Sequence, residues 1–257
     1  MSSPRKSDLP MLFSDAMVKA LVREARQPGT GKIQTRRLLQ PKIEIGPWQY
    51  IQAMHGVSPD GVAFGDPTLW RRVGPDYPDC DGGDIRVRFA VGDRIWVRET
   101  WAVGACAEGL SPVMLSPRFW MHDNGGCWYR AGGEPSHPIS PRGVWRSPIH
   151  MPRWASRLTL TVTDVRVQRL QDISEENAIA EGVRRDPVQD GTWMDYPEGT
   201  SAAGHATARG SFRSLWDSIN GQRHGAAWFE NPWVVALTFT VALRNIDAPV
   251  PSAEVAA

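Results

Sequence analysis

The sequence has little lysine, little cysteine and no long apolar run. Four of its 29 basic side chains are lysines, which leaves 25 arginines. Its three cysteines, Cys80, Cys106 and Cys127, contain no Cys-x-x-Cys pair, which argues against a zinc knuckle or a disulfide framework. No segment reaches the roughly 20 apolar residues that a membrane span requires, and residues 1–10 lack the apolar core of a signal peptide. We therefore expect a cytoplasmic protein with reduced thiols, no membrane contact, no metal and no cofactor.

The charge balance also limits the classes of partner. A formal net charge of +1 argues against strong binding to duplex DNA, which is typical of strongly basic domains. The planar fork of arginine suits base edges, phosphates and aromatic stacking, although GC-rich codon usage explains the same arginine bias equally well. The 12 tryptophans could stack on bases, but we expect most of them to fill the core and its rim.

Three segments carry helix signals. Ser14 precedes apolar residues at helical spacing, and the pattern stops at Pro28. Ser174 is a good N-cap for a second helix that extends to about Glu181. A third helix is expected to begin near Ser211.

Four segments alternate as strands do, at residues 85–89, 94–101, 158–167 and 233–241. In the third, the apolar phase slips by one residue at Asp164, which predicts a bulge or a sharp bend. Strands with few interspersed helices favour an α+β protein with a small mixed or antiparallel barrel over a doubly wound sheet.

The remaining sequence is rich in Gly, Pro and Asp and lacks periodicity. We expect disorder at residues 1–10 and 246–257. Residues 11–245 are predicted to form one domain. Long irregular insertions are expected within it at about 44–83, 102–142 and 186–210, the last of them mobile.

The polar segment at residues 31–37, Gly-Lys-Ile-Gln-Thr-Arg-Arg, follows the first predicted helix directly. It is too polar for a core strand, so we expect a loop or an edge segment that engages a nucleobase, nucleoside or RNA. A solvated loop without a function would have the same composition, so this pattern alone does not decide between the two interpretations.

Other segments connect the polar segment to a known family. Gly31, Lys32, Thr35 and Arg37 resemble the motif of ASCH domains, in the PUA-like superfamily. The Gly-Asp turn and strand at residues 91–99 and the strand after Asn-Pro-Trp at 231–233 resemble the same family. The longer members encoded by phages and prophages are more similar still, through residues 98–101, 149–157, 170–174 and 215–220. The resemblance spans most of residues 11–243 outside the insertions.

This resemblance implies a small PUA-like β-barrel with flanking helices and a cleft facing the polar segment. Short members include amidohydrolases that remove the acetyl group from N4-acetylcytidine with a Lys, a Thr and a Glu. Lys32, Thr35 and Glu181 match these three roles. Glu181 would accept a proton from Thr35 or from water, and Lys32 would polarise the developing oxyanion. The helix end also disfavours a charged carboxylate at Glu181, as acid–base catalysis near neutral pH requires.

Further residues are candidates for ligand binding. Along one strand, Trp96 and Trp101 could stack on a base while Arg98 and Glu99 read its edges. Core tryptophans and a structural ion pair would produce the same pattern. The expected binding set is Gly31, Arg37, Trp96, Arg98, Glu99, Trp101 and, as phosphate contacts, Arg153 and Arg157.

Three functions remain open at this point. The first is an amidohydrolase acting on an N-acylated base; the second is a non-catalytic module that binds RNA or a modified base; the third is a ribonuclease. The expected partner is a modified nucleoside or single-stranded RNA, and the sequence does not predict the oligomeric state. Ile33 replaces a Thr that is usual in the short enzymes, and the insertions are absent from them, so the substrate could be another acylated or hypermodified base.

Overall fold

The computed structural model describes residues 7–39, 50–57, 63–73, 84–111, 115, 126–132, 140–196 and 204–249. Helices and a mixed sheet in these ranges confirm the α+β class. Parts of the predicted disordered ends and of the predicted insertions, including Cys80, lie outside these ranges. None of the helices in the described ranges combines the length and apolarity needed to cross a bilayer.

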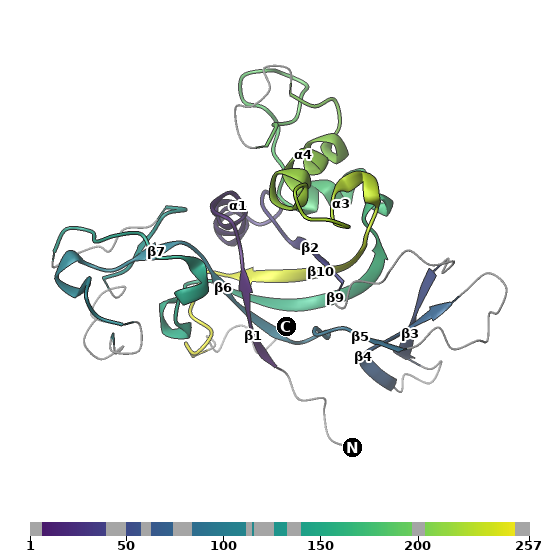
Figure 1. Cartoon of the computed structure of the whole chain (residues 1–257), viewed down its shortest axis with the longest axis horizontal. Helices are drawn as coiled ribbons and strands as arrows, with labels where there is room; N and C mark the ends of the chain where they lie inside the picture. The colour runs from purple at the N-terminus through teal and green to yellow at the C-terminus, as the bar shows by residue number, and fades with distance from the viewer. Residues whose placement is uncertain are drawn as a thin grey trace. The chain divides into compact units, whose positions relative to one another are not determined.

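Five strands form the main sheet, in the order β1-β6-β9-β10-β2 (Figure 1). The strand β1 runs parallel to β6, whereas β6 pairs with β9, and β10 with β2, in antiparallel fashion. Among the described strands the sheet is open, with β1 and β2 at its edges, and no closed barrel is formed. The strand bounds are β1 (Asp8–Leu12), β2 (Gln34–Leu38), β6 (Arg94–Arg98), β9 (Thr159–Arg169) and β10 (Trp233–Ala242).

The burial along β9 follows the predicted phase slip. Leu160 and Val162 are buried before Asp164, and Val165 and Val167 are buried after it. The strand itself continues without a break through this point. Between these buried pairs lie two successive residues, 163 and 164, that are less buried than their neighbours. The alternation of buried side chains therefore shifts by one position, as the sequence predicted.

The chain folds as two compact units. The first unit comprises Met1–Gly31, Asp93–Thr161 and Thr240–Ala257, and the second comprises Lys32–Gly92 and Val162–Phe239, as far as they are described. The strands β9 and β10 contribute residues to both units.

In the first unit, α1 (Asp15–Arg26) forms where the sequence predicted the first helix and buries Val18, Leu21 and Val22. The predicted insertion at residues 102–142 is not simply irregular. Its described residues pair β7 (Trp101–Ala102) with β8 (Trp128–Tyr129). They also supply most of a small apolar core, made of Trp101, Val103, Ala107, Leu115, Cys127, Met151 and Ala155. The apolar residues of this core are scattered along the chain and show no periodicity, so the sequence pattern did not predict it.

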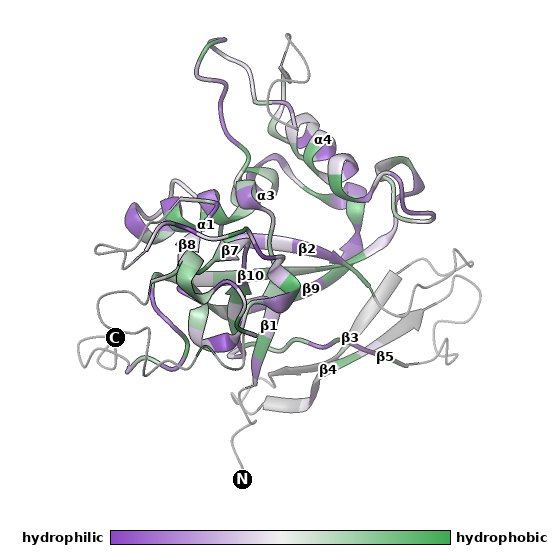
Figure 2. Ribbon diagram, turned by 60° about the vertical axis from the view of Figure 1, so that its left-hand side comes forward, coloured by the Kyte–Doolittle hydropathy of each residue, from purple (hydrophilic) through white to green (hydrophobic). Residues whose placement is uncertain are grey.

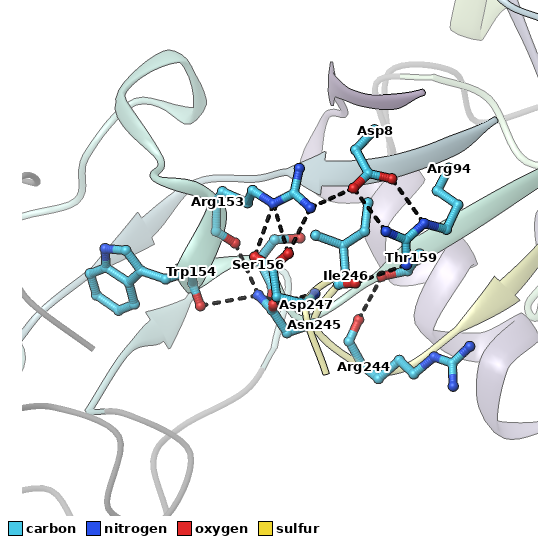
Figure 3. A network of polar contacts seen from close by, with 10 residues as sticks. All are labelled: Asp8, Arg94, Arg153, Trp154, Ser156, Thr159, Arg244, Asn245, Ile246 and Asp247. Carbon is cyan, nitrogen blue, oxygen red and sulfur yellow. Dashed lines mark hydrogen bonds and ion pairs between the residues drawn. The ribbon is translucent and has the colours of Figure 1, made fainter. Parts of the chain in front are cut away.

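The predicted disorder at residues 8–10 and 246–249 is wrong. Residues 8–10 belong to β1, and Ile246 is only 2% exposed. Figure 3 shows the alternating charges that tie these segments together: Arg153 Nη2 lies 2.6 Å from both Asp8 Oδ2 and Asp247 Oδ1. Arg94 completes the network with two bonds of 2.8 Å to Asp8. These partners are up to 145 residues apart, so local composition could not reveal them.

In the second unit, the predicted irregular insertion at residues 44–83 contains two long strands, β3 (Tyr50–Val57) and β4 (Ala63–Val73). Together with β5 (Asp84–Arg86) they form a three-stranded antiparallel sheet. The strand β5 is shorter than the predicted strand at 85–89. Main-chain pairing requires no side-chain alternation, so the Gly, Pro and Asp content did not exclude a sheet.

Two capped helices complete the second unit. The helix α3 (Glu175–Ala180) begins after Ser174, whose hydroxyl accepts a bond from the Asn177 N–H, as predicted. The helix α4 (Ala208–Asn220) begins before the predicted Ser211, because Thr207 caps it. Figure 2 shows polar and apolar residues alternating along α4. The predicted mobile loop at 186–210 is also partly ordered, since buried Trp193 bridges Arg185 and His205.

Gly31 is a position where only glycine fits. A Cβ atom there would lie 2.3 Å from the Ala20 carbonyl oxygen and 2.4 Å from the Glu24 nitrogen, both on the backbone of α1. Backbone atoms cannot move aside cheaply, so Gly31 lets the chain pass close to the helix. Its sequence signal as a binding residue therefore has a packing explanation.

We predict that Gly31→Ala lowers the free energy of unfolding by about 1–3 kcal/mol, the usual cost of overpacking. Gly109→Ala is the matched control, because a Cβ at Gly109 would meet nothing within 4 Å. Urea unfolding of both variants measures the difference. Equal stability of the two variants would show that the α1 contact is not tight.

Candidate functional site

The polar segment leads into an edge strand, one of the two forms that the sequence predicted, but its residues are buried rather than exposed. Gln34 to Leu38 form β2, and Lys32 and Thr35 are both 0% exposed. Ile33 fixes the approach to this strand: its N–H donates to the Ala180 carbonyl at 2.9 Å, and its carbonyl accepts from the Phe239 N–H at 2.9 Å. The chain is thus held between the end of α3 and β10. The polar composition of this segment predicted exposed side chains, but hydrogen-bond partners from distant segments take the place of water.

The centre of the candidate site is an ion pair between Lys32 and Glu181. The Lys32 Nζ atom lies 2.5 Å from Glu181 Oε2 and donates to the Glu181 main-chain carbonyl at 2.8 Å. The side-chain exposures are 0% and 2%. Glu181 is the C-cap of α3, where main-chain carbonyls lack partners within the helix, so an ammonium group is favourable there. The sequence predicted both residues as members of one site.

Arg36 belongs to the predicted polar segment, but no sequence pattern assigned it a role of its own in the site. Its Nη1 atom lies 2.9 Å from Glu181 Oε1 and 3.4 Å from Gln34 Oε1, and the Gln34 amide donates to Asn177 at 2.8 Å. Each carboxylate oxygen of Glu181 therefore has its own cation. The alternation of side chains in a strand could have predicted that Arg36 lies beside Gln34, because residues 34 and 36 share one face of a strand.

Thr35 does not join this cluster directly. Alternation places Thr35 and Arg37 on the face of β2 opposite Gln34 and Arg36. The Thr35 hydroxyl accepts a bond from Arg37 Nη1 at 3.0 Å, which also donates to the Arg36 carbonyl at 3.2 Å. The structure thus brings Lys32 and Glu181 together, whereas the Thr35 side chain contacts Arg37.

Burial dominates the electrostatics of the cluster. It lowers the pKa of Lys32 from 10.5 to about 8, because the ammonium loses its hydration. The Glu181 carboxylate opposes this fall, and the cations Arg37 and Arg36 add to it. Burial also lowers the pKa values of Arg36 and Arg37. Lys32 can therefore gain or lose its proton near the pH range in which enzymes work.

The two tryptophans of the expected binding set are core residues in the first unit. Trp101 is fully buried and meets Trp154 edge to face, with ring centroids 6.1 Å apart. Trp96 is 8% exposed, and the Arg98 guanidinium lies 5.1 Å from its ring centroid. Neither ring offers an open face for a base in this structure, which favours the alternative explanation by core packing.

The charged members of the set are paired within the protein. Glu99 forms a bidentate ion pair with Arg157, with both bonds at 2.9 Å. Arg98 donates to the carbonyls of Ile149 and Met151. Arg153 pairs with the two aspartates of Figure 3. Both arginines that were predicted to contact phosphate, Arg153 and Arg157, pair with carboxylates in the first unit.

Comparison of this chain with protein-family models, with curated proteins and with solved structures finds no match. In the described ranges, no group of three or more His, Cys, Asp or Glu side chains is arranged to hold a metal ion.

We predict a pH dependence of stability that comes from Lys32. The unfolded chain keeps this side chain protonated up to pH 10.5, whereas the folded chain releases the proton near pH 8. Unfolding therefore takes up a proton between these pH values, and the stability of the wild type rises with pH there. Relative to Lys32→Met, which cannot titrate, the gain should reach about 3 kcal/mol.

Urea unfolding of the wild type and Lys32→Met between pH 7 and 10.5 measures this gain. Lys19→Met, at an exposed position of α1, is the matched control and should run parallel to the wild type. A constant difference between the wild type and Lys32→Met across this range would contradict a lowered pKa.

Proposed function

We propose that this chain is an ASCH-type protein of the PUA-like class and a hydrolase of N-acylated nucleosides related to N4-acetylcytidine. The observation that carries the proposal is the 2.5 Å contact between Lys32 and Glu181, which are 149 residues apart. The resemblance of the sequence to ASCH amidohydrolases predicted these two residues as catalytic partners. The PUA-like barrel and the modified nucleoside or single-stranded RNA as partner belong to this proposal, and the open five-stranded sheet supplies only the mixed strands of such a barrel.

The chemistry that the pair supports is amide hydrolysis by an activated water. Glu181 takes a proton from the water as its oxygen bonds to the acyl carbon. Protonated Lys32 stabilises the oxyanion that forms. When the C–N bond breaks, the proton on Glu181 passes to the departing amine, so that acid and free base are released.

The geometry favours this water route over attack by Thr35. The Thr35 hydroxyl contacts Arg37 on the opposite face of β2, away from the carboxylate that would have to take its proton. A positioning role for Thr35 is the better interpretation, since it holds the guanidinium of Arg37. Because Lys32 and Glu181 are buried, a substrate must displace a covering side chain to reach them.

One observation favours the non-catalytic alternative, a module that binds RNA or a modified base. Lys32 and Glu181 already satisfy one another inside the protein, as a structural ion pair does. In that case the ion pair shapes the fold, and binding takes place without turnover.

We predict that the protein releases cytidine from N4-acetylcytidine. Lys32→Met and Glu181→Gln should each lower kcat by a factor of about 10²–10³, because each removes a group that acts on the transition state. Thr35→Val should lower it less. In the wild type, kcat should fall as the pH rises through about 8, where Lys32 loses its charge.

Chromatography of cytidine release measures these rates. Lys19→Met and Glu176→Gln are the matched controls, because both positions are exposed and should retain full activity. Absence of turnover in a folded wild type, together with salt-sensitive RNA binding, would favour the module. Strand scission abolished by Glu181→Gln would instead favour a ribonuclease.

A further inference from the structure

The guanidinium of Arg36 is incompletely used, although it is buried. Its side chain is 0% exposed, and its Nη1 atom holds Glu181 and Gln34. Its Nε and Nη2 atoms are buried and have no hydrogen-bond acceptor among the described residues. Buried donors without acceptors are rare in folded proteins, because each has lost its bonds to water without gaining a replacement.

The charge of the cluster is also unbalanced. Lys32 and Arg36 share the single carboxylate of Glu181, so two buried cations face one buried anion. The Phe212 ring, with its centroid 5.8 Å from Arg36 Cζ, offers weak compensation at most. Proteins rarely bury a surplus of charge unless a ligand or a partner neutralises it.

The two unused atoms have a particular geometry. The Nε and Nη2 groups form one edge of the guanidinium, and their parallel N–H bonds match two oxygens of a phosphate or carboxylate. Glu181 occupies the Nη1 side, so this edge remains for a second anion.

We propose that the Nε–Nη2 edge of Arg36 binds a phosphate group of the substrate. This inference rests on the proposed function for the nucleoside part of the ligand, and it extends the substrate class from a nucleoside to a nucleotide. The phosphate would supply the second negative charge of the cluster and accept the two unused N–H bonds. It must displace a covering side chain, so association should be slower than the diffusion limit.

Calorimetric titration with cytidine 5′-monophosphate and with cytidine tests the proposal in the wild type. We expect the nucleotide to bind at least about tenfold more tightly, as a charge-assisted bidentate contact implies. Arg36→Lys keeps a cation beside Glu181 but loses the fork, and it should abolish this preference. Arg213→Lys, an exposed arginine on α4, is the matched control and should retain it. Equal affinity of the wild type for both ligands would overturn the proposal.

A second measurement keeps the proposal testable if Arg36→Lys does not fold. Inorganic phosphate should raise the Tm of the wild type along a saturation curve, at an ionic strength held constant with chloride, because a ligand of the folded state stabilises it until the site is full. The general stabilising effect of phosphate as a salt grows with concentration and does not saturate in this way. No saturating rise in Tm, combined with no nucleotide binding, would overturn the proposal.

A 5′-hydroxyl hexacytidylate distinguishes the source of the phosphate. Binding of this strand that is weakened about tenfold by Arg36→Lys supports a backbone phosphate, whereas binding of the mononucleotide alone supports a terminal phosphate. The result is separate from catalysis. A nucleotide preference without deacetylation would leave the phosphate site intact and remove the hydrolase. Deacetylation without that preference would do the reverse.

Discussion

The buried ion pair between Lys32 and Glu181 is the interaction on which the rest of the candidate site depends. Moving two charges out of water costs several kcal/mol per ion, and only excellent geometry offsets that cost. Here the ammonium has a carboxylate oxygen and a helix-terminal carbonyl, and the carboxylate has a second cation in Arg36. The pair therefore fixes the start of β2 against the end of α3.

This constraint explains why the site has unusual chemical properties. Burial holds the pKa of Lys32 near 8, where its charge can change during a reaction. The same burial leaves one edge of Arg36 without an acceptor. A cluster that satisfied stability alone would contain a second carboxylate or an apolar replacement. The surplus of positive charge is thus the feature that most directly indicates an anionic ligand.

The sequence predicted those features that local patterns determine. The Ser174 cap located α3, and the alternation on either side of Asp164 located β9. The motif residues Lys32 and Glu181 are in contact, as expected. Prediction from the sequence failed where distant partners decide the outcome. The polar side chains of β2 are buried because Gln34 and Arg36 bond to Asn177 within α3 and Glu181 at its end, and Thr35 bonds to Arg37. Trp101 and the Glu99–Arg157 pair serve the core of the first unit, which no local pattern distinguishes from a binding surface.

A double-mutant cycle on Lys32→Met and Glu181→Gln tests the central contact most directly. The free energies of unfolding of the wild type, both single variants and the double variant give the coupling energy of the pair. Buried groups at 2.5 Å should couple by at least about 1 kcal/mol, so the double variant should be clearly more stable than the sum of the single losses implies. Additive losses would mean that the two side chains do not meet, and the proposed site would have no basis.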